Sequence, residues 1–216
     1  MKRLIAILFV IVIMFTLTCC SLNNPNSIVS GLAYQPGEWN KGTYNSAFLN
    51  TSIVLSGNWY SVSEKELARE KEVIIKESME DTDATEEEVE RGVEYELKIA
   101  NETSQADLSI VHKDMDIIYS MAYSEEDIMN AYKQNMQNLS NDDMHIISMS
   151  SPQWVPLGEN EYYMLEIEYS YQRTMTTYQR IYLRKIGTYM TTLTMSAIDK
   201  AEFNRLEDMF GPYIKQ

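Results

Sequence analysis

The sequence predicts an α+β domain in which helices pack on a central antiparallel β-sheet, preceded by a signal peptide and a flexible tether. Three observations support this prediction. Residues 4–15 are an unbroken apolar run. Residues 163–171 alternate between apolar and polar side chains, as a half-buried strand does. Ser63 and Ser124 each stand as helix caps before stretches with apolar residues at helical spacing.

The elements follow the order hairpin, helix, hairpin, helix, then a meander of strands and a closing helix. The expected strands are residues 44–49, 52–55, 93–100, 108–112, 163–171, 178–186 and 189–195. Helices are expected to begin at Ser63, Thr85, Ser124 and Asp199. Gly57 and Gly187 mark turns, and Gly211-Pro212 is expected to stop the last helix.

The strands at 163–171 and 178–186 give the clearest β signal. Tyr163, Leu165, Ile167, Tyr169 and Tyr171 share one face of the first strand. Antiparallel pairing about Met175 would set Ile167 opposite Leu183 and Glu166 opposite Arg184. Apolar and charge patterns would then agree across the pair, as a stable register requires.

The N-terminal run has the layout of an export signal. Lys2 and Arg3 supply positive charge, residues 4–15 are apolar, and smaller residues follow. An uncleaved transmembrane helix over residues 4–20 is the alternative, although this stretch has the minimum length that spans a bilayer. Either alternative places the domain outside the cytoplasm.

Leu17-Thr18-Cys19-Cys20-Ser21 resembles the lipobox of bacterial lipoproteins. The resemblance implies that Cys20 is lipidated and becomes the new N-terminus. Cys19 stands where Gly, Ala or Ser is usual, so it remains the alternative acceptor. A disulfide between these adjacent cysteines is a third possibility, disfavoured because such a ring strains the peptide between them.

We therefore expect a signal peptide at residues 1–19, a lipidated N-terminus and flexible linker at 20–41, and one domain at 42–216. Trp39 is expected to pack on the edge of the domain. The expected location is the outer face of the cell membrane, which would be the first partner through the covalent lipid. The oligomeric state is left open.

Charge and cysteine content restrict the function. The net charge is −14, and removal of residues 1–19 takes away two basic residues and no acidic one, which gives −16. Such a surface repels phosphate backbones and anionic headgroups, so we expect no nucleic-acid partner and a body that stands off the bilayer. Beyond Cys20 there is no cysteine for a disulfide, a nucleophile or a metal site.

A second resemblance covers most of residues 42–214. Gly42-Thr43-Tyr44-Asn45, Phe48-Leu49, Leu55 and Gly57-Asn58-Trp59 are similar to the lipoproteins of Gram-positive bacteria whose domain looks like PsbP, the extrinsic photosystem II subunit. Ser56 departs from the pattern, because a Pro usually precedes the Gly-x-Trp. The resemblance implies an α-β-α sandwich that acts in binding or assembly, and it transfers no catalytic residue.

The sequence offers little catalytic chemistry. It has two histidines, and His112 is expected to be a buried, hydrogen-bonded core residue. Asp142, Asp143 and His145 could together hold a divalent cation, but they lack a second His. Neither a nucleophile elbow, a His-Glu-x-x-His motif nor a phosphate-binding loop occurs. We therefore predict no catalytic residue, no metal site and no cofactor.

Two carboxylate-rich features have alternative explanations. Residues 77–96 hold ten acidic residues and begin like a calcium loop at Asp81, but Glu86 and Gly92 stand where the loop needs Gly and Glu. A solvated acidic helix explains them better. Glu166 and Glu168 could form a glycosidase pair, but Arg180 and Arg184 are expected to neutralise them across the sheet.

Tyr119, Met121 and Tyr123 form the candidate ligand-binding set, because exposed aromatic and Met side chains adapt to partners. The competing interpretation is that Ile117, Ile118 and Met121 plug the following helix into the core, with the two tyrosines facing outward. The expected function is a non-enzymatic, lipid-anchored extracytoplasmic binding or assembly module for an envelope protein or polymer. The alternatives are a hydrolase acting on envelope glycans and a calcium-responsive surface protein.

Overall fold

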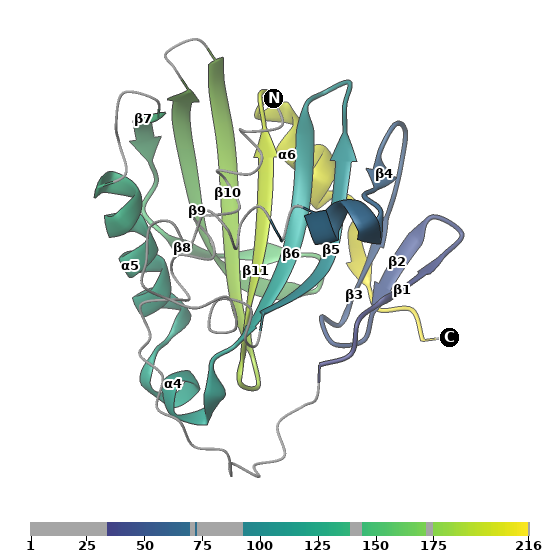
Figure 1. Cartoon of the computed structure of the whole chain (residues 1–216), viewed down its shortest axis with the longest axis horizontal. Coiled ribbons are helices and arrows are strands. Elements are labelled where there is room, and N and C mark those ends of the chain that lie inside the picture. The colour runs from purple at the N-terminus through teal and green to yellow at the C-terminus, as the bar shows by residue number, and fades with distance from the viewer. Residues whose placement is uncertain (1–33, 70–71, 73–92, 139–143, 172–174, 216) are drawn as a thin grey trace.

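The computed structural model describes residues 34–69, 72, 93–138, 144–171 and 175–215. The export signal, Cys19 and Cys20, the calcium-loop candidate at 81–92, and Asp142 and Asp143 fall outside these residues. Within them, no helix is long and apolar enough to cross a membrane. The domain is α+β, with a large antiparallel sheet at its centre (Figure 1).

The large sheet has eight strands in the spatial order β4-β5-β6-β11-β10-β9-β7, with β8 pairing the free part of β9. Every pairing in it is antiparallel. Its strands are β4 (Tyr60–Ser61), β5 (Val93–Asn101), β6 (Ala106–Asp114), β7 (Met144–Met149), β8 (Gln153–Leu157), β9 (Asn160–Tyr171), β10 (Met175–Ile186) and β11 (Tyr189–Ala197).

A smaller sheet joins the two ends of the described chain. It has the order β1-β2-β3-β12, formed by β1 (Glu38–Asn40), β2 (Thr43–Ser46), β3 (Thr51–Val54) and β12 (Phe210–Pro212). The β2–β3 pair is the expected opening hairpin. Regular structure already begins at Glu38, and the ring of Trp39 lies 5.2 Å from that of Tyr44 on β2.

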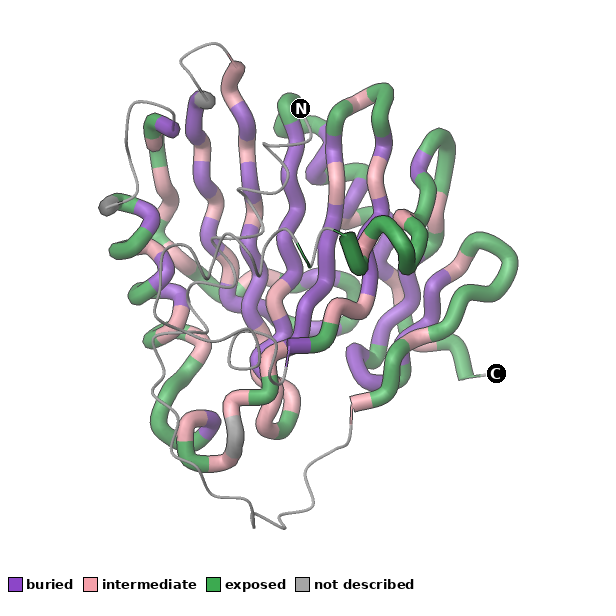
Figure 2. The backbone as a smooth tube through the Cα atoms, in the orientation of Figure 1, coloured by how far each residue is buried: buried purple, intermediate pink, exposed green. Residues whose placement is uncertain are grey.

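Two apolar cores lie on opposite faces of the large sheet, and the most buried stretches of chain run through its central strands (Figure 2). On one face, α6 (Ala201–Glu207) inserts Phe203 and Leu206 beside the small sheet. On the other, α5 (Glu125–Asn138) packs Met129, Tyr132 and Met136 against β9 and β10. Helices on both faces make the expected sandwich.

Local sequence explains where the helices begin. The hydroxyl of Ser124 and the carboxylate of Asp127 cap each other at the start of α5, with Ser124 Oγ donating to Asp127 Oδ2 at 2.6 Å. Ser63 and Glu66 make the same reciprocal cap ahead of the helical residues 64–69. Asp199 Oδ1 accepts from the backbone of Ala201 at α6. These three expected helix starts are confirmed.

The expected register of β9 and β10 is wrong. Arg180, not Arg184, lies opposite Glu166, and Ile181 lies opposite Leu165. The strands pair about residue 173 instead of Met175, because β9 continues to Tyr171 and β10 already starts at Met175. The faces are unchanged, since the slip is by an even number of positions.

Other expectations also fail locally. Leu97 and Ile99 belong to the core beside α6, but a register shift between Tyr95 and Leu97 puts Tyr95 on the other face. The cause is a β-bulge, which adds one residue and breaks the strict alternation. Strands β1, β4, β7, β8 and β12 were not predicted, and Gly211-Pro212 lies in β12 instead of ending α6.

Candidate functional site

The bulge in β5 builds a buried polar row across three strands. Tyr95 pairs with Val111 and Leu97 with Ile110, so Glu96 is the extra residue of the bulge. Its carboxylate contacts Nε2 of His112 on β6. His112 Nδ1 lies 2.8 Å from Oγ1 of Thr191 on β11. A hydroxyl can donate or accept, so it satisfies this nitrogen in either protonation state of the ring.

The small sheet completes the row. The hydroxyl of Tyr44 donates to Glu96 Oε1 at 2.8 Å and accepts from the backbone N–H of Gly37 at 2.9 Å. Burial, and then the negative charge of Glu96, raise the pKa of Tyr44, so this phenol stays a donor. The carboxylate thereby has a partner on each oxygen.

Aromatic rings close the row from solvent. The rings of Tyr34 and Phe48 each lie 5.0 Å from the imidazole of His112. The side chains of Glu96 and His112 are both 0% exposed. The hydroxyl of Thr191, the imidazole of His112 and the carboxylate of Glu96 form a connected row that resembles the triad of a hydrolase. A substrate cannot reach this row, because the side chains of His112 and Glu96 are buried. The expectation of a buried, hydrogen-bonded His112 is confirmed.

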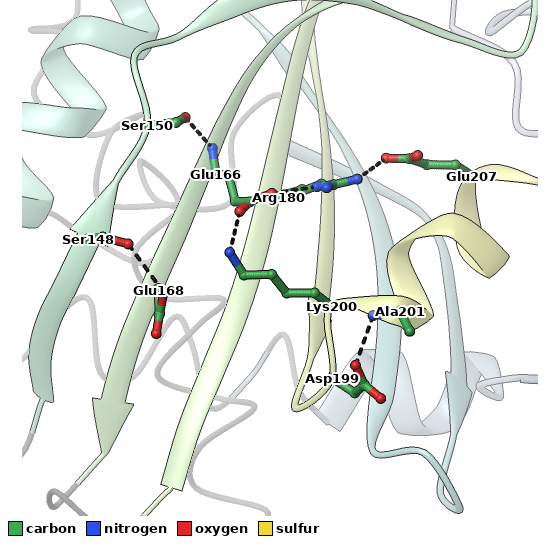
Figure 3. A network of polar contacts seen from close by, with 9 residues as sticks. All are labelled: Ser148, Ser150, Glu166, Glu168, Arg180, Asp199, Lys200, Ala201 and Glu207. Carbon is green, nitrogen blue, oxygen red and sulfur yellow. Dashed lines mark hydrogen bonds and ion pairs between the residues drawn. The ribbon is translucent and has the colours of Figure 1, made fainter.

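A second polar cluster lies on the α6 side of the sheet (Figure 3). Arg180 donates from Nε to Glu166 at 2.9 Å and from Nη1 to Glu207 of α6 at 2.5 Å. Lys200 Nζ reaches the other oxygen of Glu166 at 2.8 Å. Tyr182 adds a hydrogen bond from its hydroxyl to Glu207.

This cluster does not match the needs of a glycosidase. Partial burial raises the pKa of Glu166, but its bonds to Lys200 and Arg180 outweigh that and hold the pKa below its usual value. A general acid needs a raised pKa instead. Glu168 lies apart from the cluster, with Ser148 Oγ 3.4 Å away (Figure 3). Arg184 contacts the carbonyl of Leu49.

The candidate ligand-binding residues lie on and just after α4 (Asp116–Ala122). The exposed fractions are 83% for Met121, 62% for Ile118 and 45% for Tyr123. The rings of Tyr119 and Tyr123 stack 5.4 Å apart. We call Ile118, Tyr119, Met121 and Tyr123 the α4 cluster. The interpretation that Ile118 and Met121 plug into the core is wrong, because the helix turns them outward.

The α4 cluster is held by the end of the β10–β11 hairpin. Ser120 Oγ donates to the carbonyl of Gly187 at 3.1 Å. Lys185 Nζ donates to the carbonyl of Ser120 at 2.7 Å and lies 3.4 Å from that of Tyr123. A cation at the end of a helix satisfies carbonyls that lack partners within the helix. The cluster therefore stands on a braced platform.

The cation site considered at Asp142, Asp143 and His145 has only His145 within the described residues. His145 lies exposed on β7, and the two aspartates expected beside it are outside the described chain. Within the described ranges, no group of three or more His, Cys, Asp or Glu is placed to hold a metal ion. The potential metal ligands in this part of the chain are therefore not grouped as a metal centre.

Some buried polar atoms on the α5 face lack hydrogen-bond partners among the residues that the structure describes. Gln179 Nε2 and Ser196 Oγ are two of them, and these residues lie opposite each other on β10 and β11. Ser46 provides a contrast, because its buried hydroxyl accepts from the backbone N–H of Leu49 at 3.2 Å. Unpaired buried groups weaken a core.

Sequence reasoning missed Glu96, Thr191 and Glu207 as members of these clusters. Glu96 was placed on the polar side of a regular strand, and nothing in the local pattern marks a bulge there. Glu207 meets Arg180 only because α6 folds back over β10. The sequence did indicate one contact of the second cluster, because Arg180 was expected to neutralise Glu166.

Comparison with known proteins gives matches in structure alone. No family model and no curated protein matches the sequence. The solution structure of the cyanobacterial PsbP protein CyanoP from Synechocystis sp. PCC 6803 is similar with a TM-score of 0.46 and 12% identity, over 89% of this chain and 99% of that one. CyanoP is a PsbP protein, and PsbP is the protein named in the sequence resemblance.

A second solved structure, from Bacteroides thetaiotaomicron VPI-5482, is similar with a TM-score of 0.40 and 8% identity. The match covers 81% of this chain and 49% of that one. Both TM-scores lie below 0.5, so neither structure supports an argument about ligand, partner or activity.

Proposed function

We propose that this chain is a non-enzymatic, lipid-anchored extracytoplasmic module that binds an envelope protein or polymer through the α4 cluster. The observation that carries the proposal is the exposure of Ile118 and Met121 on α4 and of Tyr123 just after it. Isolated exposed apolar residues are ordinary, but several large ones side by side are typical of an interaction surface.

The buried groups support a binding role over a catalytic one. In the two polar clusters of the described chain, the titratable residues are enclosed, as His112 and Glu96 are, or neutralised, as Glu166 is. The α4 cluster has instead the composition of an adaptable contact surface, because Met and Tyr side chains fit varied partners at low entropic cost.

The anchor is proposed from Cys20 and the apolar run before it. A lipidated terminus carrying more than one acyl chain would hold the protein permanently, since each buried CH₂ contributes about 0.8 kcal/mol. The outer face of the cell membrane is then the place where the α4 cluster meets its partner.

Two substitutions test the anchor in cells. Cys20→Ala should abolish incorporation of a labelled fatty acid and release the protein from membranes, whereas the matched Cys19→Ala variant should remain lipidated. Loss of label only in the Cys19→Ala variant would move the acceptor to Cys19. No label in the unmodified protein would refute a lipid anchor.

The binding role is tested by in-cell cross-linking from position 121. A photo-reactive amino acid there should yield a discrete adduct in the anchored protein and much less in the Cys20→Ala form. Turnover of an envelope glycan by the purified protein, lost in Glu166→Gln, would contradict a non-enzymatic role.

A further inference from the structure

The α4 cluster lies at the end of the domain where the chain enters it. Met115, just before α4, donates its backbone N–H to the carbonyl of Thr188 at 3.0 Å. The first described residue, Tyr34, lies beside the same turn, with its ring 6.1 Å from that of Tyr189. Figure 1 shows α4 and the β10–β11 turn together at one end of the sheet.

Because Tyr34 and α4 lie at the same end of the domain, the length of the linker before Tyr34 limits the distance between the α4 cluster and an anchor. Residues 21–33 would link Cys20 to Tyr34. A flexible chain of that length has a root-mean-square reach of about 20 Å. On the anchor proposed above, the body stands off the bilayer, but the α4 cluster stays within reach of proteins that project from the same membrane.

The surroundings of the α4 cluster are acidic. Residues 114–132 contain five acidic residues and no Lys or Arg. Glu126 and Asp127 are exposed in the first turn of α5, immediately after Tyr123. Lys113 and Lys133 flank this stretch in the sequence, and the ammonium group of Lys185 bonds to the carbonyls of Ser120 and Tyr123. The apolar surface is thus bordered by negative charge.

We propose that the α4 cluster docks a segment of a membrane-bound partner protein that is both basic and apolar. Apolar side chains of the segment would cover Ile118 and Met121. Its Lys or Arg residues would face Glu126 and Asp127 and could lie over the ring of Tyr123. The proposal deepens the binding role proposed above and rests on its anchor.

Charge distinguishes this partner from the other possible occupants. An anionic bilayer surface would be repelled by the acidic border. A second copy of the chain would bring two equally acidic borders together, which costs free energy in the same way. A segment that is both basic and apolar buries apolar surface on the α4 cluster and is attracted by the acidic border.

The test places a photo-reactive amino acid at position 121 of the full chain, in the cells that produce it, and sequences the cross-linked peptide by mass spectrometry. The expected adduct joins position 121 to a Lys- or Arg-containing apolar segment of a membrane protein. The matched control places the same probe at Ile147, which is 48% exposed on β7, and should not give this adduct.

A charge reversal provides the second arm. Glu126→Lys should lower the yield of the adduct about fivefold, because like charges would then meet at the border. Glu161→Lys, an exposed change on β9, should leave the yield unchanged. Equal losses in both variants would overturn the charge argument.

The remaining outcomes also decide the matter. A lipid adduct, an adduct of two copies of this chain, an acidic partner segment, or a yield no higher than at Ile147 would each overturn the proposal. Fatty-acid labelling of the same cells reports on the anchor separately. A labelled protein with the wrong adduct refutes the docked segment alone, whereas an unlabelled protein refutes the anchor.

Discussion

The carboxylate of Glu96 contacts the imidazole of His112 inside the domain, although Glu96 has no cross-strand partner of its own. The contact exists because a bulge adds one residue to β5 and turns the side chain of Glu96 toward β6. One irregular backbone position thereby links the large sheet to Tyr44 of the small sheet.

Removing one member of this pair should be costly. Glu96→Leu leaves His112 and the Tyr44 hydroxyl facing an apolar side chain in the interior, so we expect a loss of about 3 kcal/mol in the free energy of unfolding. The double variant Glu96→Leu/His112→Leu should recover part of it, because neither partner is then left alone. Urea titrations of the unmodified protein, the single variants Glu96→Leu and His112→Leu, and the double variant measure the coupling. Strictly additive losses would contradict it.

The Glu166 cluster should stabilise the fold in a pH-dependent way. The pKa of Glu166 is lower in the folded protein than its value of about 4.5 in the unfolded chain. The ion pairs of Glu166 therefore stabilise the fold above the unfolded pKa, and this stabilisation is lost as the pH falls through the folded pKa. Glu166→Gln should therefore cost about 1 kcal/mol at pH 7. The difference from the unmodified protein should shrink as the pH drops below 4.5.

Glu168→Gln is the matched control for this prediction, because Glu168 lies on the same strand face outside the ion pairs. Urea unfolding from pH 7 down to pH 3 should show little change for it. A Glu166→Gln deficit that stayed constant over this range would exclude the ion pairs as its source.

Two buried serines should respond differently to the same change. Ser196→Ala removes a hydroxyl that has no hydrogen-bond partner in the described chain, so stability should stay equal or rise by up to about 1 kcal/mol. Ser46→Ala removes an acceptor from the N–H of Leu49 and should cost about 1 kcal/mol. Thermal unfolding compares the pair, and equal losses would show that Ser196 has a partner after all.

Gly37 should tolerate no side chain. A Cβ there would lie 2.5 Å from Cζ of Tyr44 and 2.8 Å from the carbonyl oxygen of Asn45. Gly37→Ala should therefore destabilise the protein by about 2 kcal/mol. At Gly211 the nearest atom to a Cβ would be the side-chain hydroxyl of Ser52 at 3.1 Å, so Gly211→Ala should cost less. The two melting temperatures check this order.

The sequence predicts the faces of the long strands better than their register. Tyr163, Leu165, Ile167 and Tyr169 all lie in the core beside α5, as their alternation indicates. The register was wrong because a shift by an even number of positions keeps every side chain on its face. Arg180 and Arg184 also share a face, so the charge pattern fits both registers equally well.

The site residues were predictable only where a short-range signal existed. The exposure of Tyr123 was expected because it stands directly before a clear helix cap, whereas that of Met121 competed with a core position. The partnership of Glu96 with His112 depends on a bulge, and that of Glu207 with Arg180 on the return of α6, so both arise from the tertiary fold. Periodicity within one element carries no information on such contacts.

The pairing of β12 with β3 has a consequence for how the domain forms. Phe210 lies opposite Ile53, and Asn45 exchanges hydrogen bonds with the backbone of Ile214. Contacts between residues so far apart along the chain form late, after most of the loop-closure entropy has been lost. During biosynthesis the small sheet cannot close until residues 210–214 have emerged from the ribosome, so β3 lacks its partner β12 in the nascent polypeptide until then.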